Sequence, residues 1–313
     1  MKRFLVLGIC LLMATSAFAQ QQFITIATGG TAGTYYPLGG ALADIWNKNI
    51  SKMNATAQAT GASIANINLL KGGNVDVIFT QNDVASYSYN GTELLKDQAY
   101  KDLRGMACLY NETIQLVALE SSGIKTIGDL KGKKVSVGAA GSGTEANARQ
   151  ILGAAGLTYN DIKVQYLSFG ESANNMKDGN IDAAFNTAGI PTAAIQDLAV
   201  SKKMVLVPID GQVATKLMAK YPFYALQIVP AGTYQGQNQN VTTVAVKSML
   251  AVSSKLSGDL VYKMLETMYA NTDRLIAAHS QGKNIKIESA LEGMSIPLHS
   301  GAEKYFKEKG VLK

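Results

Sequence analysis

Glycine, serine and threonine gather in two loops whose composition suits the binding of an anion. Residues 28–36 read TGGTAGTYY and residues 138–144 read GAAGSGT, and each loop has Gly-Thr just before a helix-like stretch. Glycine lets the backbone approach a ligand and aim N–H groups at it, and hydroxyls donate and accept hydrogen bonds. The N-terminus of the following helix adds attraction for negative charge. These loops favour a site for a small carboxylate over the alternative, a tight strand–helix turn without a ligand.

Polar side chains after two short buried strands extend this candidate site. Gln81 follows the strand at residues 75–79, and Asn186 and Thr187 follow the strand at residues 181–185. Strand C-terminal ends in open α/β sheets face the ligand crevice. The expected ligand contacts are Thr28, Gly30, Thr31, Gly33, Thr34, Tyr35, Gln81, Ser142, Gly143, Thr144, Asn186, Thr187 and Ala188. Two roles stay open for Asp83, a contact to a ligand amine and a structural hydrogen bond.

The residues that would support catalysis, a metal or a nucleotide are poorly placed. Ser142 lacks the G-x-S-x-G elbow of a hydrolase because position 140 is Ala140. The two histidines, His279 and His299, lie apart from any cluster of Asp, Glu or Cys. Residues 141–146 mimic a dinucleotide fingerprint, but the next strand lacks the acidic residue that holds a ribose. We expect no catalytic residue, metal or cofactor, and keep an exported hydrolase using Ser142 as the rival hypothesis.

Arginine, the usual bidentate partner of a carboxylate, is scarce and badly placed. Beyond the N-terminal segment the sequence holds only Arg104, Arg149 and Arg274, and none of them lies in a glycine loop. The sequence therefore predicts recognition by backbone N–H groups and hydroxyls without an arginine clamp.

A sequence echo indicates that one α/β unit is used twice. Residues 71–79 and 177–185 share five of nine residues at an offset of 106, and the glycine loops repeat at an offset of 110. Strands that alternate with helices imply largely parallel α/β sheets. Two such lobes facing each other form a cleft, which is where ligands bind. Asp76 and Asp182 hold matched places before buried strands, so we expect them to be turn or cap residues.

Three strands are expected to carry the chain between the lobes. Residues 103–109 and 114–119 read as two consecutive strands, and residues 241–250 read as the return crossing. Ser257 is expected to cap a long helix that continues to Leu275. The predicted organisation is lobe 1 at residues 23–113 and 243–313, and lobe 2 at residues 114–242.

The N-terminal residues read as an export signal. Lys2 and Arg3 precede an apolar stretch at residues 4–13 that is too short to span a bilayer, and residues 17–19 form an Ala-Phe-Ala cleavage site. We therefore expect residues 1–19 to be a signal peptide and the mature protein to reside in the periplasm.

Charge and cysteine content fit this compartment. Loss of two basic residues lowers the net charge from +6 to roughly +4, and the lysines are scattered without a basic run. Nucleic acid is therefore not an expected partner. Cys108 is the only cysteine after the signal peptide, so no internal disulfide is expected.

These motifs together resemble the TAXI family of solute receptors for TRAP transporters. The matching segments are residues 28–39, 81–85, 103–110, 141–145 and 189–194. The resemblance implies a type II periplasmic binding protein fold, with two lobes that close on a ligand and present it to the TRAP membrane permease. It also implies a small organic acid as ligand, such as 2-oxoglutarate or glutamate. A receptor of the same fold that serves an ABC transporter or a sensor kinase is the alternative, and the sequence specifies neither the ligand nor the oligomeric state.

Overall fold

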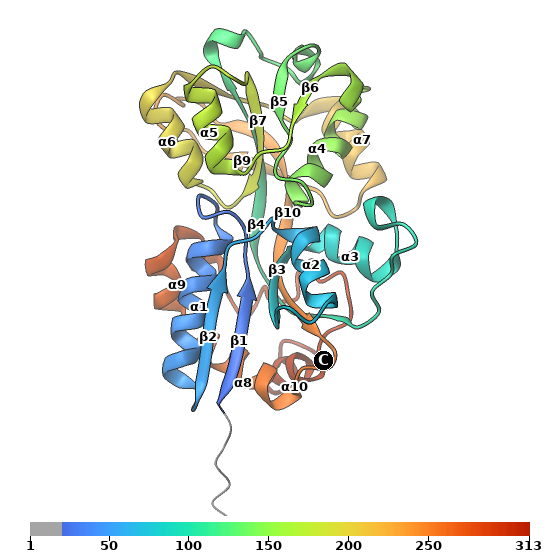
Figure 1. Cartoon of the computed structure of the whole chain (residues 1–313), viewed down its shortest axis with the longest axis vertical. Helices are drawn as coiled ribbons and strands as arrows, with labels where there is room; N and C mark the ends of the chain where they lie inside the picture. The colour runs from blue at the N-terminus through green and yellow to red at the C-terminus, as the bar shows by residue number, and fades with distance from the viewer. Residues whose placement is uncertain (1–20) are drawn as a thin grey trace, which may run out of the picture.

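The computed structural model describes residues 21–313, and the predicted signal peptide lies outside them. Two α/β lobes are stacked along the long axis of the molecule and joined by two long strands, β4 and β10 (Figure 1). The lower lobe in Figure 1 is lobe 1 and the upper lobe is lobe 2. The predicted two-lobe α/β fold is therefore confirmed. The lobe limits at 113/114 and 242/243 stay predictions, because both fall inside the strands that the lobes share.

The elements of the first half follow chain order. They are β1 (Gln22–Ala27), α1 (Tyr35–Asn49), β2 (Met53–Gln58), α2 (Ser63–Lys71), β3 (Val77–Gln81), α3 (Asn82–Asn90) and the crossing strand β4 (Leu103–Leu119). Lobe 2 adds β5 (Lys134–Ser136), α4 (Gly143–Ala154), β6 (Lys163–Gln165), α5 (Phe169–Lys177), β7 (Ala183–Ala188), α6 (Ala193–Ser201), β8 (Met204–Val207), α7 (Gly211–Lys220) and β9 (Ala225–Val229). The chain returns through β10 (Val241–Ser253) and completes lobe 1 with α8 (Gly258–Ala270), α9 (Thr272–Ala278) and α10 (Ser300–Glu308).

Sheet topology explains the sequence echo. The strand order is β2-β1-β3-β10-β4-β7-β5-β6, with β8 paired to β4 and β9 paired to β10. Strand β3 lies parallel to β1 and antiparallel to β10, and β7 lies parallel to β5 and antiparallel to β4. The two halves, β2-β1-β3-β10 and β6-β5-β7-β4, therefore repeat one arrangement. Each echoed segment contributes the third strand of its half, β3 or β7.

Asp76 and Asp182 have the structural role that the echo predicts. The Asp76 carboxylate accepts a hydrogen bond from the Thr25 N–H at 2.8 Å, and the Asp182 carboxylate accepts one from the Lys134 N–H at 2.8 Å. Each acid thereby ties the turn before its strand to the neighbouring parallel strand, β1 or β5.

Two element predictions are wrong in detail. The two strands expected at 103–109 and 114–119 are one continuous strand, β4, because Glu112, which reads as an interruption, is buried within the ladder. The long helix expected from Ser257 to Leu275 breaks between α8 and α9 at Asn271, whose side chain donates to the Thr267 carbonyl at 2.8 Å. Such a side-chain bond competes with continuation of the helix.

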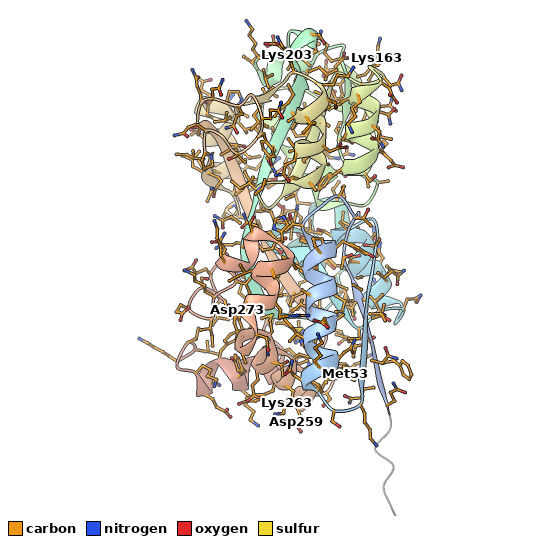
Figure 2. The ribbon with its side chains drawn as sticks, turned by 90° about the vertical axis from the view of Figure 1, so that its left-hand side faces the viewer. Met53, Lys163, Lys203, Asp259, Lys263 and Asp273 are labelled. Carbon is orange, nitrogen blue, oxygen red and sulfur yellow. The ribbon has the colours of Figure 1, made fainter. Side chains whose placement is uncertain are left out.

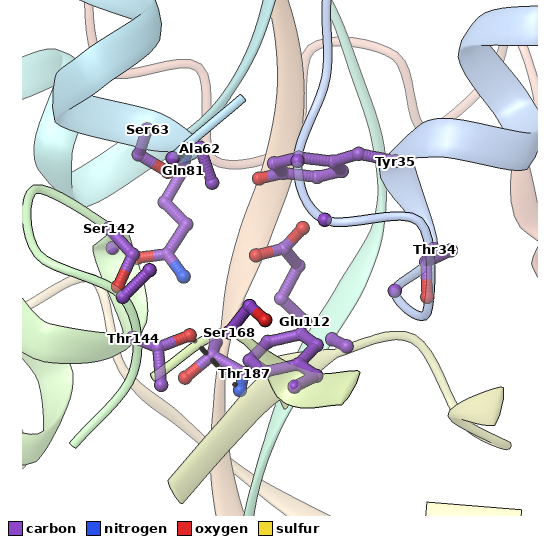
Figure 3. Close-up of a pocket in the computed structure, with 18 of the residues that line it drawn as sticks. Thr34, Tyr35, Ala62, Ser63, Gln81, Glu112, Ser142, Thr144, Ser168 and Thr187 are labelled. Carbon is purple, nitrogen blue, oxygen red and sulfur yellow. Dashed lines mark hydrogen bonds between the residues drawn. The ribbon is translucent and has the colours of Figure 1, made fainter. Parts of the chain in front are cut away.

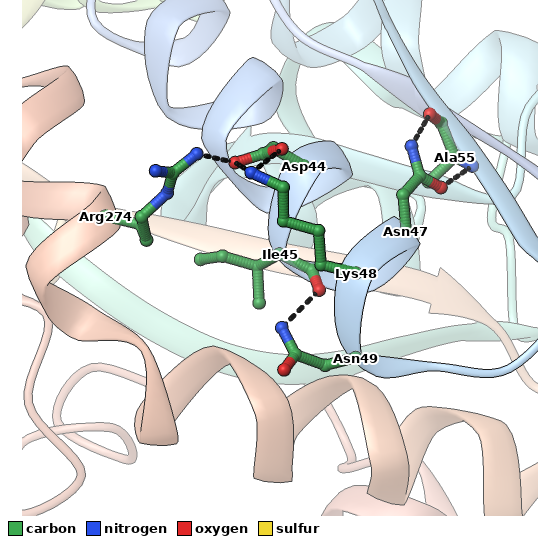
Figure 4. Close-up of polar contacts among 7 residues, drawn as sticks. All are labelled: Asp44, Ile45, Asn47, Lys48, Asn49, Ala55 and Arg274. Atoms are coloured by element: carbon green, nitrogen blue, oxygen red, sulfur yellow. Dashed lines mark hydrogen bonds and ion pairs between the residues drawn. The ribbon is translucent and has the colours of Figure 1, made fainter.

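Helix α1, which follows the first glycine loop, is held on both sides. Its apolar face, including Leu42 and Trp46, is buried, as the helical spacing predicts. On the outer side Asp44 pairs with Arg274 of α9, and the Asn47 amide donates to the Ala55 carbonyl of β2 at 2.9 Å (Figure 4). These contacts join α1 to α9 and β2.

Charged side chains are found at both distal ends of the molecule. Lys163 and Lys203 lie at the far end of lobe 2, and Asp259 and Lys263 lie at the far end of lobe 1 (Figure 2). Within residues 21–313, none of the helices has the length and apolar character that crossing a bilayer requires.

Candidate ligand-binding cavity

A cavity of about 60 Å³ lies between the lobes and is lined by residues of both. Ten of the thirteen predicted contacts line it: Gly30, Gly33, Thr34, Tyr35, Gln81, Ser142, Gly143, Thr144, Thr187 and Ala188. The two glycine loops, 110 residues apart in sequence, therefore meet across one space. That they bind a ligand stays a prediction.

Three predicted contacts do not line the cavity. The Thr28 hydroxyl donates to the Gln58 carbonyl at 2.7 Å, inside the strand–loop junction, and Thr31 is exposed on the outside of its loop. Asn186 is buried and its amide donates to the Ala184 carbonyl at 3.3 Å. Successive residues of a strand point to opposite faces, so Asn186 and Thr187 point in opposite directions; Ala188, the last residue of β7, lines the cavity beside Thr187.

Nine further lining residues escaped the sequence reasoning. They are Gly29, Thr60, Gly61, Ala62, Ser63, Glu112, Ala139, Ser168 and Phe169. The echo offered a signal for Ser63 and Phe169, since these residues begin the helices that precede the two echoed segments. No sequence signal marked Glu112, which lies in the middle of a strand.

Four helix N-termini converge on the cavity. The first residues of α1, α2, α4 and α5, namely Tyr35, Ser63, Gly143 and Phe169, all line it. The first N–H groups of a helix have no partner within the helix, and each N-terminus carries about half a positive charge. Because each lobe supplies two of these ends, an anion in the cavity interacts favourably with both lobes at once.

Glycine at position 143 permits close contact between the lobes. A Cβ atom there would lie 2.2 Å from Oε1 of Gln81, which reaches across from the end of β3. At Gly33, in the opposite loop, a Cβ would lie 3.3 Å from the Phe169 ring. An added Cβ at position 143 would displace the end of the Gln81 side chain, and one at position 33 would make a tight contact with Phe169.

Three buried polar atoms on the cavity wall have no hydrogen-bond partner among the described residues. They are the Tyr35 hydroxyl, Oε1 of Gln81 and the Thr187 hydroxyl. Buried polar groups in native proteins are nearly always hydrogen-bonded, and leaving one unsatisfied costs about 1–3 kcal/mol. A polar ligand in the cavity would satisfy such atoms.

Glu112 places a carboxyl group inside the same cavity. Its residue is only 2% exposed, and Figure 3 shows the carboxylate among the lining side chains, with Tyr35 on one side and Thr187 on another. Burial raises the pKa of Glu112 to about 8, and the nearby polar groups of Tyr35 and Gln81 act in the opposite direction. The cavity therefore combines positive helix ends with one acidic group.

Direct hydrogen bonds already join the lobes around the cavity. The Gly189 N–H of lobe 2 donates to the Thr34 hydroxyl of lobe 1 at 3.1 Å, and the Ile64 N–H of lobe 1 donates to the Gly141 carbonyl of lobe 2 at 3.0 Å. The described arrangement is therefore one in which the lobes are in contact.

Asp83 belongs to a second, separate polar network between the lobes. Its carboxylate accepts a hydrogen bond at 3.0 Å from Asn147 of α4, which also donates to the Tyr224 hydroxyl at 2.8 Å. Tyr224 in turn donates to Gln150 at 2.5 Å, and Gln150 donates to Tyr87 at 3.0 Å. Burial raises the pKa of Asp83 to about 7. Of the two roles left open for Asp83, the structure supports the structural hydrogen bond, because Asp83 does not line the cavity.

Ser142 and the histidines serve as helix caps. The Ser142 hydroxyl accepts a hydrogen bond from the Glu145 N–H at 3.1 Å at the start of α4, and His299 accepts one from the Gly301 N–H at 3.2 Å at the start of α10. His279 accepts one from the Gln281 N–H. Among residues 21–313 no cluster of three or more His, Cys, Asp or Glu residues is arranged to hold a metal ion.

The three arginines within residues 21–313 lie away from the cavity. Arg149 pairs with Glu145 on α4, Arg274 pairs with Asp44, and Arg104 donates to the Lys101 carbonyl at 2.6 Å. Recognition without an arginine clamp stays a prediction.

Comparison with known proteins identifies the family and supports the fold. The NMT1-like family matches residues 26–310. The periplasmic binding protein BugD is similar in structure with a TM-score of 0.58 at 10% identity, covering 93% of this chain and 98% of BugD. A putative L-cystine ABC transporter protein from Listeria monocytogenes has a TM-score of 0.53 at 18% identity, covering 85% of this chain and 98% of that one.

A third structure carries a bound molecule. It is the alkanesulfonate-binding protein SsuA from Xanthomonas axonopodis pv. citri bound to MOPS, with a TM-score of 0.50 at 13% identity, covering 93% of this chain and 94% of that one. At these identities the matches establish the fold alone. The chain therefore belongs to the NMT1-like family and has the two-lobe fold of periplasmic binding proteins.

Proposed function

We propose that this protein is a periplasmic solute-binding protein that captures a small organic acid between its lobes and delivers it to a membrane transporter. The observation that carries the proposal is the convergence of four helix N-termini on one interlobe cavity whose wall holds unpartnered polar atoms. Such an arrangement attracts a carboxylate, and a ligand that contacts both lobes binds more strongly than one that contacts a single lobe. The similarity to periplasmic binding proteins supports the same function.

The proposed ligands are a dicarboxylate such as 2-oxoglutarate, or glutamate. Isothermal titration calorimetry against dicarboxylates, 2-oxo acids and amino acids tests this directly, using protein freed of bound solute by unfolding and refolding. We expect at least one member of the panel to bind with a 1:1 stoichiometry. Folded, ligand-free protein that binds none of them would refute the proposal.

The proposed partner is a TRAP-type permease, on the strength of the TAXI-like motifs in the sequence. An ABC transporter is the second candidate, favoured by the structural match to a putative cystine ABC transporter protein. The two are separated by incubating the tagged protein, with and without ligand, with detergent-solubilised membranes and identifying the retained permease by mass spectrometry. A TRAP permease among the retained proteins supports the first candidate, and an ABC permease supports the second.

A hydrolase that uses Ser142 is the competing hypothesis, and the geometry disfavours it. The Ser142 hydroxyl caps α4, and no histidine is among the residues that line the cavity. Replacing Ser142 with alanine removes the cap and should weaken ligand binding, since loss of an N-cap costs about 1 kcal/mol. Turnover of an ester or amide substrate that disappears in this variant would favour the hydrolase.

A further inference from the structure

We propose that Glu112 forms an acceptor subsite for the ammonium group of an α-amino acid, so that the preferred ligand is a zwitterion and not a dicarboxylic 2-oxo acid. This inference rests on the proposed function, because it assigns a ligand class to the same cavity. It starts from the carboxyl group of Glu112, which is buried in the cavity wall and faces the space that a ligand would occupy (Figure 3).

Among residues 21–313, no cation forms an ion pair with this carboxyl group. The described residues that line the cavity include no Lys, Arg or His, and Glu112 takes part in none of the ion pairs found in residues 21–313. An unpaired carboxylate away from water is unstable and tends to hold its proton. A ligand that brings its own positive charge would supply the missing partner.

Hydroxyl groups near Glu112 partly offset the effect of burial on its pKa. Hydroxyl groups of Tyr35 and Ser248 face it and lower its pKa, while the more distant Asp83 raises it. The Tyr110 hydroxyl is also buried near it, and the hydroxyls of Tyr35, Ser248 and Tyr110 have no hydrogen-bond partner among the described residues. A carboxylate has about four lone-pair sites, so hydroxyls close to it can donate to it and still leave sites for a donor from the ligand.

Charge decides between the two ligand classes. A second carboxylate placed beside Glu112 would force one of the two acids to keep its proton, because like charges in close contact cannot both ionise. An ammonium group has three donors and no acceptor, and therefore matches Glu112. The carboxylate of the same ligand would remain with the helix N-termini. An α-amino acid carries both groups on one carbon, which suits a cavity this small.

The test compares pairs of ligands that differ only at the α-carbon. Calorimetry would use L-glutamate with 2-oxoglutarate, L-alanine with pyruvate, and L-leucine with 4-methyl-2-oxopentanoate, on wild type and Glu112→Gln. In the pair that binds, we expect the wild type to have at least tenfold higher affinity for the amino acid than for its oxo partner. We expect Glu112→Gln to remove that preference. Glu145→Gln is the matched control, since Glu145 pairs with Arg149 and does not line the cavity.

Proton release gives a second readout that needs no variant. Binding of an ammonium group makes Glu112 give up its proton, so titrations at pH 7 in phosphate and Tris buffers should report release of close to one proton per amino acid bound. An oxo acid should release none. If oxo acids bind as tightly as amino acids, or if amino acids bind without proton release, the proposed Glu112 subsite is refuted. The proposal of a carboxylate receptor is not affected by that result. If no member of any pair binds, the receptor proposal itself fails and the subsite fails with it.

Discussion

Replacing Glu112 with glutamine should change how the stability of the ligand-free protein depends on pH. Glutamine keeps the shape of the side chain and removes its titration. In the wild type, burial raises the pKa of Glu112 from its ordinary 4.5 to about 8. The folded protein therefore binds a proton that the unfolded chain releases, and this contribution to stability is lost as the pH rises from about 4.5 to about 8.

The magnitude follows from the two pKa values. Between pH 5 and pH 8 a group with these values in the unfolded and folded states changes the free energy of unfolding by about 3 kcal/mol. The four helix N-termini favour the ionised form, so this figure is an upper limit. Asp83, whose pKa is also raised, contributes a dependence of the same sign, but it is present in both proteins. The difference between wild type and variant therefore isolates Glu112.

Urea unfolding followed by circular dichroism at pH 5, 6, 7 and 8 provides the assay. The wild type should lose stability relative to Glu112→Gln by up to about 3 kcal/mol across this range. Fully parallel stability curves for the two proteins would refute the reasoning, since they would mean that Glu112 has the same affinity for protons in the folded and unfolded states. A saturating amino acid should abolish the difference in slope if Glu112 ionises on binding.

Three other predictions concern the glycines and the lobes. Gly143→Ala, which places a methyl group 2.2 Å from Oε1 of Gln81, should weaken ligand binding about tenfold by calorimetry, whereas Gly153→Ala, with no atom within 4 Å of the added Cβ, should not. Gly301→Ala, whose Cβ would lie 2.1 Å from the Gly258 carbonyl oxygen, should lower the free energy of unfolding by about 1–3 kcal/mol in urea. Small-angle X-ray scattering should show a smaller radius of gyration with ligand than without, and an unchanged profile would contradict closure of the lobes.

Local sequence patterns were sufficient to predict the parts of the fold that occur in both lobes. The duplicated Gly-Asn-x-Asp segments lie in matched turns because each aspartate ties its strand to a parallel neighbour. The glycine loops were recognisable because few other residues permit such close approach at the start of a helix. Both features depend on residues close together in the chain.

Which side chains face the cavity depends on contacts between residues far apart in the sequence, and local patterns do not predict those contacts. Glu112 reads as a polar break between two strands, and only the pairing of β4 with β7 and β10 places it in the cavity. Thr28 and Thr31 share the composition of a binding loop, but the turn directs one to a backbone carbonyl and the other to the surface. Which of two adjacent polar residues, Asn186 or Thr187, faces the cavity depends on the register of β7, which local composition does not specify.

The most direct test of the central claim is a crystal structure of the protein with the solute that calorimetry identifies. We predict electron density for the ligand between the lobes, with its carboxylate within about 3 Å of N–H groups at the starts of α1 and α4. The account would be contradicted if the ligand density lay on an outer surface, or if the interlobe cavity were empty in crystals of the protein–solute complex.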